Sequence, residues 1–246
     1  MVVAELEVYH SRPIAPTRRV ALGKMTLPAD PPPGFGGILL GGIVANHIGD
    51  IDPDLVPDLM RLTIELEEGR RIPQPRLRHR FQVDKVGLQR SRHRLVGQGE
   101  ALHFEFDDPH GVPAQQVLAA VYAAGQLDPA VRRAVMAAVR RAVRWVGGAG
   151  DELISVLAGV GVGRPLSTHA LENPRSWAID VLGLGPPPSA NGGSGNGDGD
   201  RATRRAAVQR RFREQVRAAH PDHGGDADAA AQRIAELTEA RRILLG

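Results

Sequence analysis

A glycine- and proline-rich run near the C-terminal end limits how this chain can fold. It extends from Pro186 to Asp200 and reads Pro-Pro-Pro-Ser-Ala-Asn-Gly-Gly-Ser-Gly-Asn-Gly-Asp-Gly-Asp. No apolar side chain in it is larger than alanine, so it cannot contribute to a hydrophobic core. The chain has 246 residues, of which 42% are hydrophobic, and this is enough for more than one folded unit. We therefore expect separately packed units on a chain with a strong internal boundary.

The composition excludes several classes of site and leaves the partner open. The chain has no cysteine, which excludes disulfides, thiolate metal ligands and cysteine nucleophiles. No run approaches the roughly 20 apolar residues of a spanning helix. The start, Met-Val-Val-Ala-Glu-Leu-Glu, lacks the charge order of a secretory signal, so we expect a cytoplasmic protein. Nearly all basic residues are arginines, which suit carboxylate or phosphate pairing but also follow from GC-rich coding.

The first 170 residues contain strand patterns. Apolar residues alternate within 79–89 and again within 93–108, where Leu102, Phe104 and Phe106 recur at every second position. A short polar turn separates the two stretches. This arrangement predicts an antiparallel hairpin that joins them.

Helical patterns surround the predicted hairpin. Leucines recur at helical spacing in 53–68, and two further helices are predicted at 113–127 and 129–146, each with proline near its first turn. Asp128 is the predicted N-cap of the second of these. We assign residues 1–170 to a mixed α/β domain, and the whole chain to the α+β class.

The glycines of residues 34–50 could suggest a phosphate-binding loop. There is no Gly-x-x-x-x-Gly-Lys-Ser/Thr and no regular Gly-x-Gly-x-x-Gly. The run is better explained by an apolar turn that lets neighbouring elements pack closely. His47 and Asp50 beside it form an alternative candidate site.

Charged segments of the N-terminal region have more than one explanation. The basic amphipathic helix 130–146 could lie on an anionic membrane surface, but a core-facing helix with a charged exterior is the preferred interpretation. Residues 52–68 are acidic and residues 70–94 are basic. That contrast could serve packing or self-association, and the sequence does not decide between them.

Residues 203–219 form an amphipathic helix with a basic flank. Val208, Phe212 and Val216 share one apolar stripe at 100° per residue. Two basic edges lie away from this stripe, one formed by Arg210, Arg213 and Arg217 and the other by Arg204 and Arg211. The helix therefore has one side for packing and one solvated positive side.

A His-Pro-Asp corner follows this helix. Pro221 fixes its own φ and disfavours helical geometry at His220, so the helix should end there. Asp222 follows, and Asp228 is predicted to cap a second helix at 229–245 whose apolar side faces back onto the first. Two antiparallel helices then hold the tripeptide at their exposed tip.

This pattern resembles helices two and three of the J-domain of DnaJ-like co-chaperones. The segment Trp177 to Pro188, Trp-Ala-Ile-Asp-Val-Leu-Gly-Leu-Gly-Pro-Pro-Pro, is similar to the first helix of that family and the prolines after it. The resemblance covers residues 174–246 and departs from the family in the long insertion at 185–200. Loop closure costs only about 0.6 kcal/mol per doubling of length, so the fold should tolerate the insertion. The predicted core of this small all-α unit comprises Val181, Leu182, Val208, Phe212, Val216, Ile234, Leu237 and Leu244.

The resemblance implies a function without an active site. J-domain proteins stimulate ATP hydrolysis by DnaK-type chaperones, so we expect no enzyme, no catalytic residue and no cofactor here. It implies that His220, Pro221 and Asp222 contact the junction of the partner's ATPase domain and its linker. The basic flank, Arg210, Arg213 and Arg217, would meet an acidic surface of that domain. Residues 1–170 would then supply client choice, self-association or targeting, as in specialised J-proteins.

Other interpretations remain. His220 and His223 have a spacing compatible with metal binding, but no further ligand lies close in sequence, so we expect no metal site. The arginines could be a merely solvated face or could contact nucleic-acid phosphates. The second helix, however, offers mostly alanine, isoleucine and leucine where a helix-turn-helix reader needs polar side chains. Alternatively, residues 1–170 form an enzyme or ligand-binding domain with an accessory tail, or the chain is a scaffold without a chaperone partner.

Overall fold

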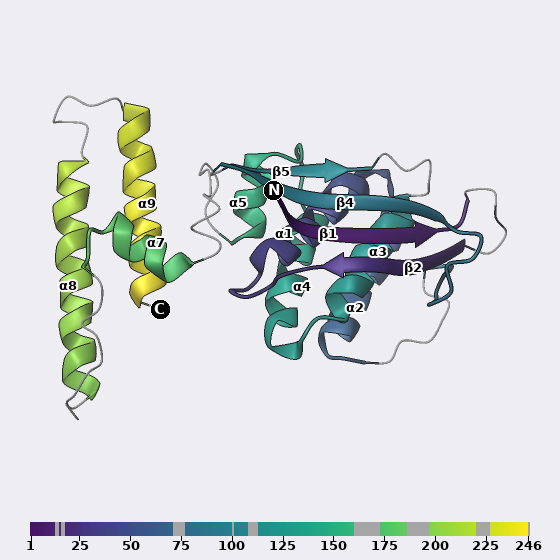
Figure 1. Ribbon diagram of the computed structural model, residues 1–246, viewed down its shortest axis with the longest axis horizontal. Helices are drawn as coiled ribbons and strands as arrows, with labels where there is room; N and C mark the ends of the chain where they lie inside the picture. The colour runs from purple at the N-terminus through teal and green to yellow at the C-terminus, as the bar shows by residue number, and fades with distance from the viewer. Residues whose placement is uncertain are drawn as a thin grey trace. The chain divides into compact units, whose positions relative to one another are not determined.

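The computed structural model describes residues 1–12, 15, 18–70, 77–99, 101–107, 113–159, 173–185, 197–219 and 227–245. It divides into two compact units, Met1–Thr168 and His169–Gly246. The first unit combines a five-stranded sheet with helices, and the described part of the second is helical (Figure 1). The predicted α+β class is confirmed.

The sheet of the N-terminal unit is built around its first strand. The strands are β1 (Val2–His10), β2 (Arg18–Thr26), β3 (His79–Phe81), β4 (Gln89–Gln98) and β5 (Ala101–Phe106), in the spatial order β3-β2-β1-β4-β5. β1 is antiparallel to both of its neighbours, and β4 is antiparallel to β5. β3 pairs with β2 in the parallel direction.

The unit contains an antiparallel hairpin, but its arms are β4 and β5, so the predicted pairing of residues 79–89 with 93–108 was wrong. Residues 93–108 do not form one arm: β4 and β5 pair with each other across Gly99, which has a φ of 63°. Residues 79–88 contribute only the short β3, and Val83 beyond it is 89% exposed. The arms were misassigned because the positive-φ glycine, and not the polar segment at 90–92, reverses the chain.

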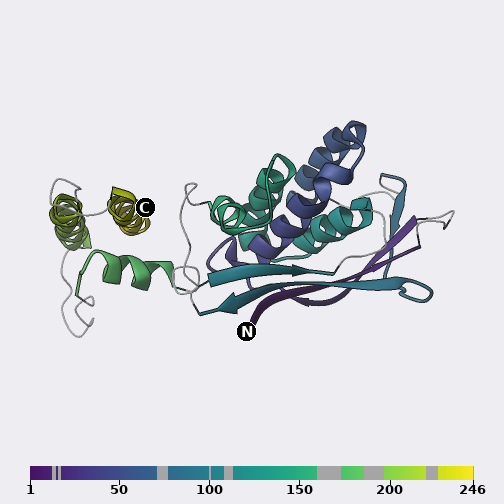
Figure 2. The same ribbon diagram turned by 90° about the horizontal axis from the view of Figure 1, so that it is seen from above.

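Helices of the N-terminal unit cover one face of the sheet (Figure 2). They are α1 (Gly34–His47), α2 (Val56–Glu67), α3 (Pro113–Gly125), α4 (Pro129–Val143) and α5 (Asp151–Leu157). The predicted helices at 53–68, 113–127 and 129–146 correspond to α2, α3 and α4, with α2 preceded by a 3₁₀ turn. Asp128 is confirmed as the N-cap of α4, because its carboxylate accepts a hydrogen bond of 2.8 Å from the Ala130 backbone nitrogen.

Residues 34–47 of the glycine-rich segment form the largely buried helix α1, so the prediction of a turn there was wrong. The expected close packing is present. A Cβ at Gly36 would stand 2.7 Å from the Leu27 carbonyl carbon, and one at Gly41 would stand 2.6 Å from a Leu157 methyl. At Gly42 a Cβ would collide with the ring of Phe104. Burial between the sheet and the other helices therefore outweighs the poor helix propensity of glycine.

The C-terminal unit contains three described helices, α7 (Pro174–Val181), α8 (Gly197–Ala218) and α9 (Ala227–Leu245). α8 and α9 lie side by side and antiparallel, and α7 crosses them (Figures 1 and 2). The Asn173 side chain caps α7 by accepting a bond of 3.2 Å from the Ser176 nitrogen. Gly183, with a φ of 62°, ends the helix, and the Leu184 nitrogen donates back to the Ile179 oxygen at 2.9 Å.

Two predicted boundaries of the C-terminal unit are corrected. α8 begins at Gly197, so the last part of the 185–200 insertion is helical instead of preceding a helix at residue 203. α9 begins at Ala227, so Asp228 lies within its first turn and is not the N-cap residue. Residues 186–196 and 220–226 lie outside the described part of the chain.

Candidate functional site

The three helices of the C-terminal unit share one apolar cluster. Its buried members are Ala178, Leu182, Val208, Leu237 and Ala240, and the half-buried side chains of Val181, Phe212, Val216 and Leu244 pack against them. The structure therefore brings together seven of the eight predicted core residues. The eighth, Ile234, is half-buried. This cluster fixes which side of α8 faces inward.

The opposite side of α8 is basic and exposed. Arg210, Arg213 and Arg217, hereafter the basic face, are all exposed. Arg210 lies 4.0 Å from Glu214, and the Arg213 Nε donates to the Gln209 carbonyl at 3.3 Å. These contacts lie within one exposed helix and are weak. Most of the hydrogen-bonding capacity of these guanidinium groups therefore faces solvent.

The arginines of α9 are used differently. Arg233 donates to the Val181 carbonyl at 3.1 Å and so ties α9 to α7. The Arg241 guanidinium lies 4.9 Å from the centre of the Phe212 ring on α8, a cation–π contact. A hydrogen bond with Glu239 raises the pKa of Arg242. Arg233 and Arg241 thus connect α9 to its neighbours, whereas the arginines of the basic face are available to a partner.

The predicted contact tripeptide lies outside the described residues. His220, Pro221 and Asp222, together with His223, fall between the described ends of α8 and α9. α8 ends at Ala218, in agreement with the expected effect of Pro221 on the preceding backbone. The basic face belongs to the half of α8 that leads to this corner.

Some positions that build this unit were not identified from the sequence. Asn173 and Gly183 terminate α7, and Arg233 and Arg241 connect helices. The Asn-Pro pair before α7 and the glycine after it are ordinary helix-boundary signals that could have indicated the first two. The two arginine contacts depend on the tertiary arrangement and leave no local signal.

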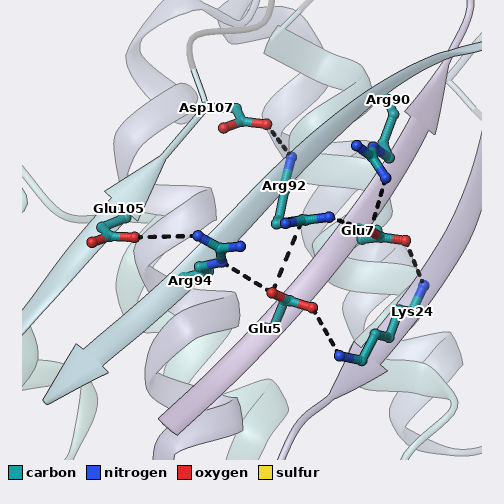
Figure 3. A network of polar contacts seen from close by, with 8 residues as sticks. All are labelled: Glu5, Glu7, Lys24, Arg90, Arg92, Arg94, Glu105 and Asp107. Atoms are coloured by element: carbon teal, nitrogen blue, oxygen red, sulfur yellow. Dashed lines mark hydrogen bonds and ion pairs between the residues drawn. The ribbon is translucent and has the colours of Figure 1, made fainter. Parts of the chain in front are cut away.

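A second charged surface covers the face of the sheet that carries no helices in the described structure (Figure 3). The Glu5 and Glu7 carboxylates of β1 are surrounded by cations of β2 and β4. Glu5 lies 3.0 Å from the Arg94 Nε and 3.3 Å from the Lys24 Nζ. Glu7 lies 3.2 Å from an Arg92 terminal nitrogen. The hydrogen bond from Arg94 lowers the pKa of Glu5, so these charges compensate one another.

The acidic and the basic segment of the N-terminal unit form ion pairs with different elements. Arg92 and Arg94 of the basic segment pair with β1, while Glu67 at the end of the acidic helix lies 2.6 Å from Arg140 of α4. The remaining side of α4 is buried through Val135, Met136, Ala138, Val139 and Ala142. α4 therefore packs into the unit with its valines facing inward, as the core-facing interpretation predicts.

His47 and Asp50 do not share an environment. His47 is buried with its Nδ1 2.8 Å from the Ile43 carbonyl, whereas Asp50 is exposed. His47 instead faces His93, with ring centres 5.9 Å apart. Across the described ranges, no three His, Asp or Glu side chains are grouped so that they could hold a metal ion. This polar cluster is a buried part of the core.

The buried histidine of β4 makes the N-terminal unit sensitive to acid. Burial lowers the pKa of His93 to about 4, against a hydrogen bond to Gln116 at 2.9 Å, and His47 and His10 lower it further. The unfolded chain takes up this proton near pH 6.5. Stability should therefore be full above pH 6.5 and should decrease as the pH falls toward about 4. Chemical denaturation at several pH values measures this.

A substitution separates His93 from other acid-sensitive groups. His93→Gln should reduce the pH dependence of the unfolding free energy, because the buried imidazole is then absent from the native and the unfolded chain. Equal slopes for wild type and His93→Gln would contradict the assignment.

Comparison with protein-family models, curated proteins and solved structures gives no match. In the part of the chain that the structure describes, no helix is both long enough and apolar enough to cross a membrane. The functional conclusion therefore depends on the residues themselves.

Proposed function

We propose that this chain is a cytoplasmic J-domain co-chaperone that stimulates ATP hydrolysis by a DnaK-type chaperone and has no active site of its own. The observation that carries the proposal is the division of α8 into two sides. Phe212 and Val216 pack toward α9, and the basic face points to solvent directly before the His-Pro-Asp corner. The N-terminal unit would select clients, mediate self-association or direct the chain to a location.

The proposed mechanism uses charge to orient the partner and the corner to act on it. Exposed guanidinium groups on one rigid helix raise the association rate with an acidic surface and fix the docking register. His220, Pro221 and Asp222 would then contact the junction between the ATPase domain and its linker. Binding both segments biases the conformational equilibrium that controls ATP turnover. Asp222 supplies a carboxylate that an arginine of the partner can hold in two places.

Reversing charge on the basic face should weaken stimulation of the chaperone ATPase. For Arg213→Glu/Arg217→Glu, we expect about tenfold more co-chaperone to be needed for half-maximal stimulation, because rim charges act mainly on association. The measurement is steady-state ATP hydrolysis by a DnaK-type chaperone over a concentration series of the full chain.

The matched control is Arg204→Glu/Arg211→Glu, which makes the same change of charge on the other flank of α8. Both of its arginines are exposed, and Arg211 contacts only Glu214 of the same helix among its described ion pairs. This control should behave like wild type. Equal impairment of the two variants contradicts the role of the basic face, and absence of stimulation by wild type contradicts the function itself.

A further inference from the structure

The last strand of the sheet has an edge that no other strand pairs with in the part of the chain that the structure describes. Among the described strands, β5 lies at one end of the order and pairs only with β4. The Asp107 nitrogen donates to the Arg92 carbonyl at 3.2 Å, so the odd-numbered positions of this ladder bond to β4. In an antiparallel strand, the N–H and C=O groups of successive residues point alternately to the two neighbouring strands. The N–H and C=O groups of Leu102, Phe104 and Phe106 therefore point to the open side.

The side chains of β5 do not protect this edge. Phe104 and Phe106 are half-buried, and their rings stack with centres 5.2 Å apart. On the other face, His103 and Glu105 are 45% and 49% exposed. Natural sheet edges are usually blunted by lysine, proline, a bulge or a covering element. β5 contains neither lysine nor proline and presents an apolar row beside its unpaired backbone groups.

We propose that β5 pairs antiparallel with β5 of a second copy of this chain, about a two-fold axis at Phe104. This axis sets Phe104 opposite Phe104 of the second copy and Leu102 opposite Phe106. On the other face, it sets His103 opposite Glu105 twice, so that each carboxylate meets an imidazole that can donate to it.

The two neighbouring registers are less favourable. An axis at His103 sets each Glu105 opposite Ala101, so its carboxylate loses the imidazole opposite it. An axis at Glu105 sets two carboxylates opposite each other. Like charges directly across a strand pair are destabilising. A shift of one β5 strand by one residue against the other would place the apolar row of one copy on the same face as the charged row of the second copy. The side-chain pattern of β5 thus selects the axis at Phe104.

The pairing would join the two N-terminal sheets edge to edge with their helices on the same side. It covers the half-exposed phenylalanine rings and supplies partners for the backbone groups of the edge. The self-association site is argued from β5 alone and stands whether or not the chain acts on a chaperone. A dimer formed in this way would carry two copies of the C-terminal unit.

Disulfide trapping tests the register, because the natural chain has no cysteine. Cα atoms in a non-hydrogen-bonded antiparallel pair are about 4.5 Å apart, within the range that a disulfide bridges. A mixture of full-length His103→Cys and Glu105→Cys chains should form a covalent dimer under mild oxidation, and neither variant alone should do so efficiently. Cross-linking of His103→Cys alone would instead indicate an axis at His103 and overturn the proposed register.

Sedimentation of the full chain over a concentration series tests the association itself. A short edge gives an interface of the weaker class, so dissociation should be visible on dilution. His103→Glu places a carboxylate opposite Glu105 twice per dimer and should raise the dissociation constant about tenfold. His103→Glu/Glu105→Lys should restore association, and Arg80→Glu on β3 at the other edge should not change it. A monomer at all concentrations with no cross-linked product overturns the proposal.

Discussion

Leu237→Ala should remove most of the stability of the C-terminal unit and leave the N-terminal unit unaffected. Leu237 is 0% exposed and lies on α9 at the centre of the cluster with Leu182 and Val208. Truncating a buried leucine to alanine costs about 3 kcal/mol through lost burial and the remaining cavity. A unit of this size has only about 3–5 kcal/mol of stability from its core. One substitution therefore removes most of the stability of the helices that carry the basic face.

Hydrogen exchange followed by mass spectrometry measures this effect in the full chain. A loss of about 3 kcal/mol corresponds to a decrease in protection of α8 and α9 on the order of hundredfold. Protection of α1 and α3 should stay at its wild-type level, because they belong to the other unit. Thr238→Ala is the matched control, an exposed position on the same helix. If Leu237→Ala leaves α8 as protected as Thr238→Ala does, the cluster is not what holds this unit together.

The core of the C-terminal unit could be predicted because its signals are local. Val208, Phe212 and Val216 recur at helical spacing, and Leu237 and Leu244 do so on the next helix. Two amphipathic helices joined by a short connection have few ways to bury such stripes. The start of α8 was predicted too late, because Gly and Asp are poor helix formers and the structure nevertheless includes residues 197–200.

The first two strands were not predicted, although β1 carries a period of two. Its inward positions include Leu6 and Val8, and its outward positions include Glu5 and Glu7. Acidic residues usually mark a solvated face, but both glutamates are nearly buried beneath the arginines of β4. That burial depends on residues more than 80 positions away in the chain, so no local pattern could predict it.

The glycine-rich helix α1 illustrates the opposite failure. Local propensity favours a turn, because Gly36, Gly41 and Gly42 lower helix stability. The structure shows that each of them faces a close neighbour, such as Leu27, Leu157 or Phe104. The need for small residues comes from tertiary packing. The sequence alone indicated that neighbouring elements pack closely against these glycines, but it did not predict that the glycines belong to a helix.

His220→Gln should abolish stimulation of the chaperone ATPase without changing the fold. Glutamine is polar and of similar size but lacks the imidazole of the proposed contact tripeptide. We therefore expect the variant to fold like wild type, with α8 and α9 equally protected from hydrogen exchange, and to lose its effect on the chaperone. Charge on α8 is unchanged, so the loss would belong to the corner and not to the basic face.

The decisive measurement is steady-state ATP hydrolysis by a DnaK-type chaperone with the wild-type chain or His220→Gln added at equal concentration. We expect stimulation by wild type and, with His220→Gln, a rate indistinguishable from that of the chaperone alone. Equal stimulation by the two proteins, or none by wild type, would contradict the proposed function.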